Sequence, residues 1–336
     1  MAFRAITGHR PIRDLLARAV GRGTLPPSLL FSGPDGVGKR LTAVALAQAL
    51  NCDRPIITTT TQGFTEQDAC GECAACSRIA RGVHADVFTI TPGDSGTIKL
   101  DQVRDAIDRT GYRPFEGRRR VVTVDDAHAL NLESQNALLK TLEEPPPASV
   151  FVLVTDRPDV LLPTVRSRCQ RLRFGPLATA DVAALLVQEQ GLGEADAFAA
   201  AAASEGSIGR ALEGSAEDAT EARDVAARLL QGTAGSTDPR RRLDGAKLLV
   251  GAGDRDELAR RLRALSSLIR DVGVLPSSGD AHTLANTDLR PQLETLTRSF
   301  DADRLLNAFA NVDRALVALD RNASPKIVAD WVALNL

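Results

Sequence analysis

The first half of the chain contains short runs made mostly of apolar residues. Runs of this length that do not alternate are typical of strands buried on both faces of a parallel sheet. Four such strands are predicted, at 28–32, 86–90, 121–124 and 150–155. Around them lie segments of good helix formers, at 11–20, 41–50, 100–110 and 132–144. This alternation predicts an α/β domain built on a parallel sheet.

The second half shows helical spacing instead. Apolar residues repeat at intervals of three and four in two stripes, which are Leu258, Leu262, Leu265, Ile269 and Val272, and Leu305, Phe309, Val312, Leu316 and Leu319. This period places each stripe on one face of a helix, so we expect two amphipathic helices that pack against other helices. Shorter helices are expected near 181–190 and 194–204, and 232–238 has the Gly/Ser/Thr composition of a linker.

The first predicted strand runs into a glycine-rich loop that ends in a lysine, and a helix follows at once. This order is the context of a phosphate-binding P-loop. The glycines let backbone N–H groups converge on a phosphate, and the start of the helix adds a partial positive charge. The alternative is a glycine-rich turn that binds no ligand. The predicted phosphate-binding residues are Gly33, Pro34, Asp35, Gly36, Val37, Gly38, Lys39 and Arg40.

Arg40 departs from the P-loop pattern, because the lysine is normally followed by a Ser or Thr that holds Mg²⁺. Thr42 lies two residues further along the helix, too far to be a sure substitute. We therefore expect phosphate binding at this loop, with ATP and Mg²⁺ as the candidate ligands, and little hydrolysis.

Two acids end the third predicted strand. Asp125 and Asp126 directly follow Val121–Val124, which is the pattern of a Walker B motif. In that pattern Asp125 polarises Mg²⁺ through its water shell, and Asp126 takes the place of the glutamate that positions the attacking water. Aspartate is one methylene shorter, which weakens a catalytic role for Asp126. The alternative is a strand end capped by acids. The preceding Arg118–Arg120 predicts a solvated strand edge or a contact with phosphate backbone.

The cysteines predict a metal site. Cys70, Cys73 and Cys76 are spaced three apart, so that their thiolates wrap one face of a tight turn, and Cys52 is the natural fourth ligand. His84 is the alternative fourth ligand. Free thiols or a redox pair would be the other explanation, but paired Cys-x-x-Cys steps favour structural Zn²⁺. An odd, clustered set of five cysteines argues for a reducing cytosol and against a disulfide framework.

Composition narrows the class further. Hydrophobic residues make up 43% and charged residues 25%, as in an ordinary soluble protein. The net charge of −2 creates no strong field for nucleic acid, so any DNA contact must come from a local patch or a larger assembly. No apolar run approaches the roughly 18 residues of a membrane span. The first residues lack the apolar core of a signal peptide, so a cytoplasmic protein is expected.

The segment 132–146, together with the P-loop and the strand that ends in two acids, resembles the AAA+ clamp-loader subunits of bacterial DNA polymerase III. The end of the fourth strand, at Thr155, falls where that family has its sensor 1. Residues 166–169 resemble the family's Ser-Arg-Cys motif, whose arginine reaches into a neighbouring subunit's ATP site. The resemblance implies that Arg168 is this trans arginine finger and that Cys169 is buried. A planar guanidinium can neutralise charge on a transferring phosphoryl group.

Two further features belong to the resemblance, which is strong over residues 1 to about 215. Arg210 falls in a region similar to sensor 2, where an arginine contacts the γ-phosphate, although Gly209 shifts it by one place. A zinc module of four cysteines after the P-loop helix is also a family feature. The family spacing between the first and second cysteine is shorter than the one from Cys52 to Cys70.

The implied fold is an α/β P-loop AAA+ domain with a parallel sheet, a small helical lid domain and an all-α collar domain. The expected boundaries are 1–175, with the zinc module at 52–76, then 176–232 and 238–336. In the family the collar holds a pentamer together, but a plain helical bundle would give the same apolar stripes.

Two kinds of subunit compete within the family. One hydrolyses ATP, and the other is stationary and donates the arginine finger. Arg40, Asp126 and the shifted Arg210 weaken the chain's own site while Arg168 is intact, which favours the donor. The implied partners are gamma/tau and delta subunits in a hetero-pentamer, the sliding clamp and primer–template DNA, with no membrane. An autonomous P-loop ATPase and a nucleotide-independent DNA-binding module remain open, the latter disfavoured by scarce aromatic residues.

Overall fold

The computed structural model describes residues 2–59, 63–93, 95–213, 216–234, 238–251, 254–276, 284, 286, 289–320 and 323–336. The chain divides into two compact units. The first is Met1–Asp181 with Ser207–Gly209, and the second is Val182–Gly206 with Arg210–Leu336. Among the helices of the described ranges, none is both long and apolar enough to cross a bilayer.

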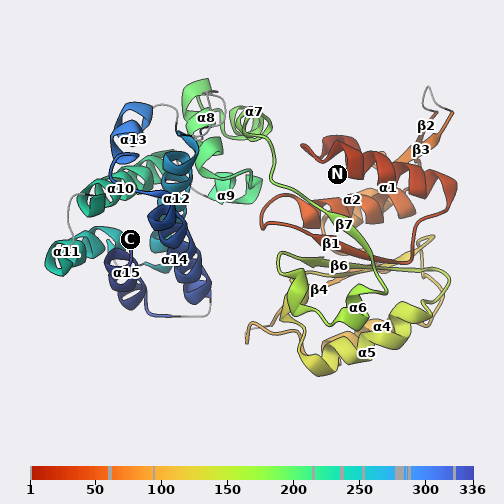
Figure 1. Ribbon diagram of the computed structural model, residues 1–336. Helices are drawn as coiled ribbons and strands as arrows, with labels where there is room; N and C mark the ends of the chain where they lie inside the picture. The colour runs from red at the N-terminus through yellow and green to blue at the C-terminus, as the bar shows by residue number, and fades with distance from the viewer. Residues whose placement is uncertain are drawn as a thin grey trace. The chain divides into compact units, whose positions relative to one another are not determined.

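A five-stranded sheet forms the centre of the first unit, and its strand order is β4-β5-β6-β1-β7 (Figure 1). Every neighbouring pair is parallel, as predicted. The strands are β1 (Ser28–Ser32), β4 (Val87–Ile90), β5 (Arg120–Val124), β6 (Ser149–Thr155) and β7 (Gln170–Arg173). The sequence did not predict β7, because only Leu172 of its four residues is buried and apolar.

Helices cover both faces of this sheet (Figure 1). On one face lie α1 (Arg10–Arg22), α2 (Lys39–Asn51) and α3 (Ala74–Ala80), and on the other α4 (Leu100–Thr110), α5 (Leu132–Glu143) and α6 (Pro163–Arg166). Successive strand residues point to opposite faces, so Leu29 and Phe31 join the first core and Leu30 joins the second. Three short 3₁₀ turns complete the unit, at Phe3–Ala5, Ala127–Ala129 and Pro158–Val160.

The segment after α2 forms a β-hairpin. Strands β2 (Ile56–Thr59) and β3 (Thr65–Asp68) pair antiparallel, and β3 packs against α1. Residues 60–62, between the two strands, lie outside the described residues. A Cβ on Gly21 of α1 would come within 2.8 Å of the Thr65 carbonyl oxygen, so the close approach of the hairpin requires glycine there.

The second unit is helical. Its helices in the described ranges are α7 (Thr179–Gln190), which begins in the first unit, α8 (Glu194–Ala203), α9 (Ile208–Glu213), α10 (Ala216–Ala234), α11 (Pro239–Val250), α12 (Arg255–Val274), α13 (Arg290–Leu296), α14 (Ala302–Asp320) and α15 (Pro325–Leu334). The first predicted stripe is fully buried along α12. The prediction for Phe309 is wrong, because this side chain is 44% exposed and its neighbour Ala308 lies in the core of α14 instead.

One apolar core joins α10 to the helices that follow it. It contains Ala222, Val225 and Leu229 of α10 together with α12 and α14 residues. The boundaries expected at 175/176 and at 232–238 stay predictions, and residues 235–237 of the expected linker lie outside the described residues.

Candidate functional site

The carboxyl edge of the sheet brings the predicted motifs together. Ser32 at the end of β1 is in register with Thr155 at the end of β6, and the backbone N–H of Gly33 donates to the Thr155 carbonyl. Asp125 follows β5, which is the other neighbour of β6. Ligands of open parallel sheets bind at this edge, where a crevice forms beyond the strand ends.

The glycines of the P-loop have the conformations that the motif requires. Gly36 and Gly38 have φ angles of 69° and 97°, which L side chains rarely adopt. A Cβ on Gly36 would lie 2.1 Å from Ser207 Oγ, and the Gly209 N–H donates to the Gly36 carbonyl at 2.9 Å. The segment Ser207–Gly209 therefore packs directly on the apex of the loop.

Lys39 is buried at the base of this loop. Its Nζ donates to the carbonyl oxygens of Gly33 and Pro34, at 2.8 and 2.6 Å. Burial lowers the pKa of Lys39, and nearby carboxylates, first Asp35 and then Asp156, oppose that shift. A buried ammonium group inside a glycine-rich loop at a helix start fits a phosphate group.

A magnesium ion does not fit the usual place beside this lysine. Thr42 is fully buried and its Oγ1 donates to the Gly38 carbonyl at 2.9 Å, so the hydroxyl serves the helix backbone. The Arg40 guanidinium lies at the Walker B carboxylate, with Nη1 3.5 Å from Asp125 Oδ2. Burial and the charge of Asp126 raise the pKa of Asp125, against the opposing effect of Arg40.

Asp126 and Thr155 stand beside a histidine that the sequence analysis missed. His128 Nδ1 lies 3.1 Å from Asp156 Oδ1 and 3.3 Å from Thr155 Oγ1. The hydrogen bond from His128 lowers the pKa of Asp156. Asp126 is exposed, and its left-handed backbone, at φ 49°, starts the turn that carries His128. The sequence feature that could have pointed to His128 is its place two residues after Asp126.

Arg168 lies on the turn after α6, and in the sequence it is far from the P-loop and Walker B residues. Its Nη1 donates to the Thr164 carbonyl at 2.9 Å, and its Nη2 pairs with Glu143 at the end of α5. The side chain remains 30% exposed. Cys169 is buried, as predicted, and burial raises the pKa of its thiol to about 12.

Arg210 belongs to the second unit, on α9. It forms an ion pair with Glu205, whose backbone has a φ of 53°. Its contact with a γ-phosphate stays a prediction.

The structure brings four cysteines together. The Sγ atoms of Cys52, Cys70, Cys73 and Cys76 all lie within 4.8 Å of one another, and those of Cys52 and Cys73 are 3.9 Å apart. A tetrahedron of thiolates about 2.3 Å from one metal ion has edges of about 3.8 Å. The donor set therefore fits a four-coordinate metal ion.

Backbone N–H groups stabilise the thiolate form of one of these cysteines. Those of Glu72 and Cys73 point at Cys70 Sγ, and they lower its pKa to about 6 although burial acts in the opposite direction. Burial raises the pKa of Cys76. His84, the alternative fourth ligand, instead contacts Glu116 through Nε2 at 3.5 Å.

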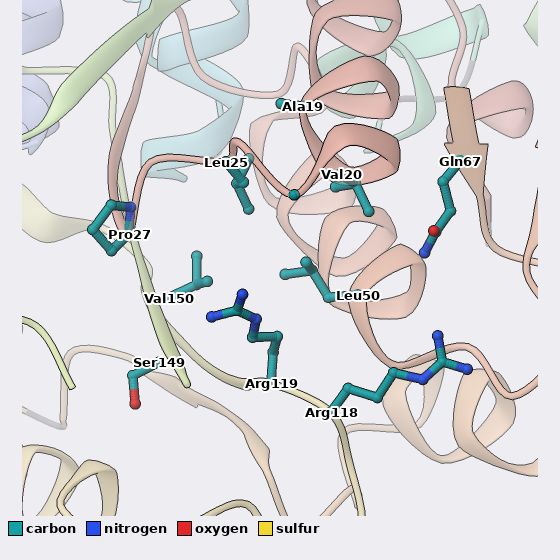
Figure 2. A pocket seen from close by; sticks show the side chains of 11 residues that line it. Ala19, Val20, Leu25, Pro27, Leu50, Gln67, Arg118, Arg119, Ser149 and Val150 are labelled. Atoms are coloured by element: carbon teal, nitrogen blue, oxygen red, sulfur yellow. The ribbon is translucent and has the colours of Figure 1, made fainter. Parts of the chain in front are cut away.

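The three consecutive arginines do not form one patch. Arg120 is buried in an ion pair with Asp86 at 2.8 Å, so the expectation of a solvated edge is wrong for this residue. Its neighbours Arg118 and Arg119 line a pocket of about 180 Å³ at the amino end of the sheet, shown in Figure 2. The other lining residues are Ala19, Val20, Gly23, Leu25, Pro27, Leu50, Gln67, Ser149 and Val150.

The fold and the site are those of a P-loop α/β protein. Residues 8–178 match the family profile described as "DNA polymerase III, delta subunit". The chain belongs to this family.

Individual relatives agree with the family. The chain is 40% identical over 150 residues to DNA polymerase III subunit delta' of Pseudomonas aeruginosa, covering 44% of this chain and 43% of that one. It is 35% identical over 172 residues to DNA polymerase III subunit tau of Bacillus subtilis, covering 51% and 29%. The chain thus spans less than half the length of these relatives. A gamma subunit-related protein of Thermotoga maritima superposes with a TM-score of 0.45 at 17% identity, covering 95% and 96%.

Proposed function

We propose that the chain is a delta-prime-type subunit of a DNA polymerase III clamp loader, which donates Arg168 in trans to a neighbouring ATPase subunit. The observation that carries the proposal is the contrast between two sites. The chain's own P-loop has Arg40 on Asp125 and a Thr42 hydroxyl bound to the backbone, which is unsuited to hydrolysis with Mg²⁺. The Arg168 guanidinium is partly exposed and keeps unused N–H donors.

In this role the subunit is a fixed end of a ring that includes gamma/tau and delta subunits. ATP binding tightens the ring until it opens the sliding clamp, and primer–template DNA then triggers hydrolysis and release. Arg168 contributes positive charge to the phosphoryl group in the neighbour's site. Asp125, Asp126 and Thr155 contribute to the chain's own site, and Arg210 is the proposed contact for a γ-phosphate. The complex would act in the cytoplasm.

We further propose that the four cysteines hold a structural Zn²⁺. All four positions come from the protein, which is the pattern of a structural zinc and leaves no open position for catalysis. The metal would fasten the turn at Cys70–Cys76 to the end of α2 through Cys52.

The second unit offers a surface for assembly. Ile327, Trp331 and Leu334 recur at intervals of four and three along α15, and their exposed fractions are 69%, 37% and 38%. An exposed apolar stripe that includes a tryptophan is typical of a protein interface. It supports the proposal that this unit packs against other subunits as a collar.

The experiment is steady-state ATPase of a reconstituted clamp loader on primed DNA with clamp. Replacing a trans arginine finger costs about a thousandfold or more at the site it serves. We expect Arg168→Ala to lower the bulk rate markedly if the sites act together, and the isolated chain to show no ATPase. Arg166→Ala is the matched control, since Arg166 lies two residues away and pairs with Asp159.

Either of two results would overturn the proposal. An unchanged rate with Arg168→Ala would remove the finger. Robust ATPase from the isolated chain would favour a gamma-type subunit or an autonomous P-loop ATPase. The retained Lys39 and Asp125 are the observation that supports this alternative.

A further inference from the structure

The Arg40 guanidinium lies beside Asp125, the carboxylate that the Walker B pattern assigns to a divalent cation. Its Nη1 is 3.5 Å from Asp125 Oδ2. The Asp125 side chain is 14% exposed and the Arg40 side chain is 65% exposed, so the carboxylate is fixed in the site while the guanidinium reaches it from the solvent side. We propose that Arg40 replaces Mg²⁺, bridging Asp125 and the outer phosphates of a nucleoside diphosphate or triphosphate, so that the loop binds the nucleotide without a divalent cation.

The surroundings of Asp125 exclude the metal for two reasons. Magnesium demands near-octahedral oxygen coordination at about 2.0–2.1 Å, and the chain offers no hydroxyl next to Lys39. The nearest hydroxyl along the helix, on Thr42, donates to the Gly38 carbonyl and is fully buried. The guanidinium also places a positive charge at the carboxylate that the metal would need, and like charges repel.

A guanidinium can neutralise and hydrogen-bond the phosphate oxygens that Mg²⁺ would bind, although it cannot coordinate ligands octahedrally. It is always charged and presents five N–H donors in a planar fork that matches both carboxylate and phosphate oxygens. Arg40 is adjacent to Lys39 at the start of α2, where helix N–H groups also favour an anion. One edge of the fork can therefore stay on Asp125 while the other takes a phosphate oxygen.

The acidic groups around the loop do not prevent this binding. Asp35 and Asp126 are exposed, so water and salt screen their charges. Asp156 lies 3.7 Å from Arg157 Nε, whose positive charge offsets its own, and 3.1 Å from His128 Nδ1. Lys39 and Arg40 are adjacent cations at the end of the loop.

The proposal rests on the P-loop as a nucleotide site and is independent of Arg168. The test is a titration of the full-length chain with a ribose-labelled fluorescent ADP, in magnesium-free buffer and in millimolar Mg²⁺. No chelator is added, so that any metal ion held by the four cysteines is not removed. We expect dissociation constants that agree within about twofold in the two buffers. Binding that is about tenfold tighter with Mg²⁺ would overturn the proposal, and so would a lack of binding in both buffers.

Arg40→Thr supplies the missing hydroxyl and removes the guanidinium. A hydrogen bond to a charged group contributes enough that metal-free affinity should fall by about tenfold to a hundredfold, and Mg²⁺ should now restore part of it. Arg104→Thr on α4 removes the same charge from an exposed position and should leave both titrations unchanged. An Arg40→Thr protein that binds metal-free ADP as tightly as wild type would contradict the bridge. Arg168→Ala should not alter this titration. A negative result in the titration would therefore overturn the Arg40 proposal without bearing on the trans ATPase assay.

Discussion

Asp86→Asn tests what holds the strand that delivers Asp125 to the site. Asp86 is fully buried and accepts hydrogen bonds from the backbone N–H groups of Phe115, Glu116 and Gly117, each at 2.8 Å. Arg120, the first residue of β5, donates to it through Nη2 at 2.8 Å. One carboxylate thus fixes both the loop before β5 and the beginning of that strand.

The magnitude follows from the pKa of Asp86. Burial raises this pKa, but the three N–H donors and Arg120 outweigh burial and bring it from 3.8 to about 2. Each pKa unit corresponds to about 1.4 kcal/mol, so the ionised carboxylate contributes about 2.5 kcal/mol to folding. Because the folded pKa is depressed, this contribution is present above pH 4 and is lost as the pH falls from about 4 to about 2.

The asparagine variant should lose at least this much at neutral pH. It also leaves the buried Arg120 charge without its partner, and breaking a buried pair in this way costs about 3–5 kcal/mol. The single tryptophan, Trp331, lies in the second unit and does not report on β5. The assay is therefore hydrogen exchange of peptides that cover β5, where a loss of 2.5 kcal/mol accelerates globally protected amides by about fiftyfold or more.

The control is Asp108→Asn on α4, an exposed position where the change should stay within about 0.5 kcal/mol. Exchange in the Asp86 variant that matches this control would refute the reasoning. So would wild-type protein whose β5 exchange, corrected for the intrinsic rate, does not accelerate between pH 4 and pH 2.5.

Two further outcomes are expected. Purified protein should contain about one equivalent of zinc by atomic emission, and Cys73→Ser should lose it while Cys169→Ser keeps it; stoichiometric zinc in the Cys73 variant would exclude the four-cysteine site. Gly36→Ala should unfold the first unit more readily by about 1–3 kcal/mol in the same exchange assay, because its φ is 69° and its Cβ would meet Ser207 Oγ at 2.1 Å; unchanged exchange around the P-loop would contradict that contact.

The sequence predicted the parts of the molecule that periodicity and loop chemistry control. Four of the five sheet strands are mostly apolar runs, and such runs can be predicted without any tertiary information. The P-loop could be predicted from the sequence because its glycines and lysine must occupy fixed places between a strand and a helix. Strand β7 could not be predicted, because an edge strand with one buried side chain shows almost no apolar pattern in the sequence.

The interactions inside the site could not be predicted in the same way. Arg40 was visible as a departure from the motif, but its position at Asp125 depends on how two strands align across the sheet. The pairing of Arg168 with Glu143 joins residues 25 positions apart and leaves no local pattern. The fate of Arg120 is similar, since only the fold shows that one arginine of three turns inward to Asp86.

The contact between Gly36 and Gly209 limits how this sequence can vary. A Cβ on Gly209 would lie 2.9 Å from the Gly36 Cα, and a Cβ on Gly36 would collide with Ser207. Neither glycine can therefore gain a side chain while the other segment stays where it is. Gly209, which the family resemblance predicts to be an extra residue before Arg210, is a positional requirement of the loop it touches. A chain from which Gly209 is deleted would have to rebuild the apex of its P-loop at the same time.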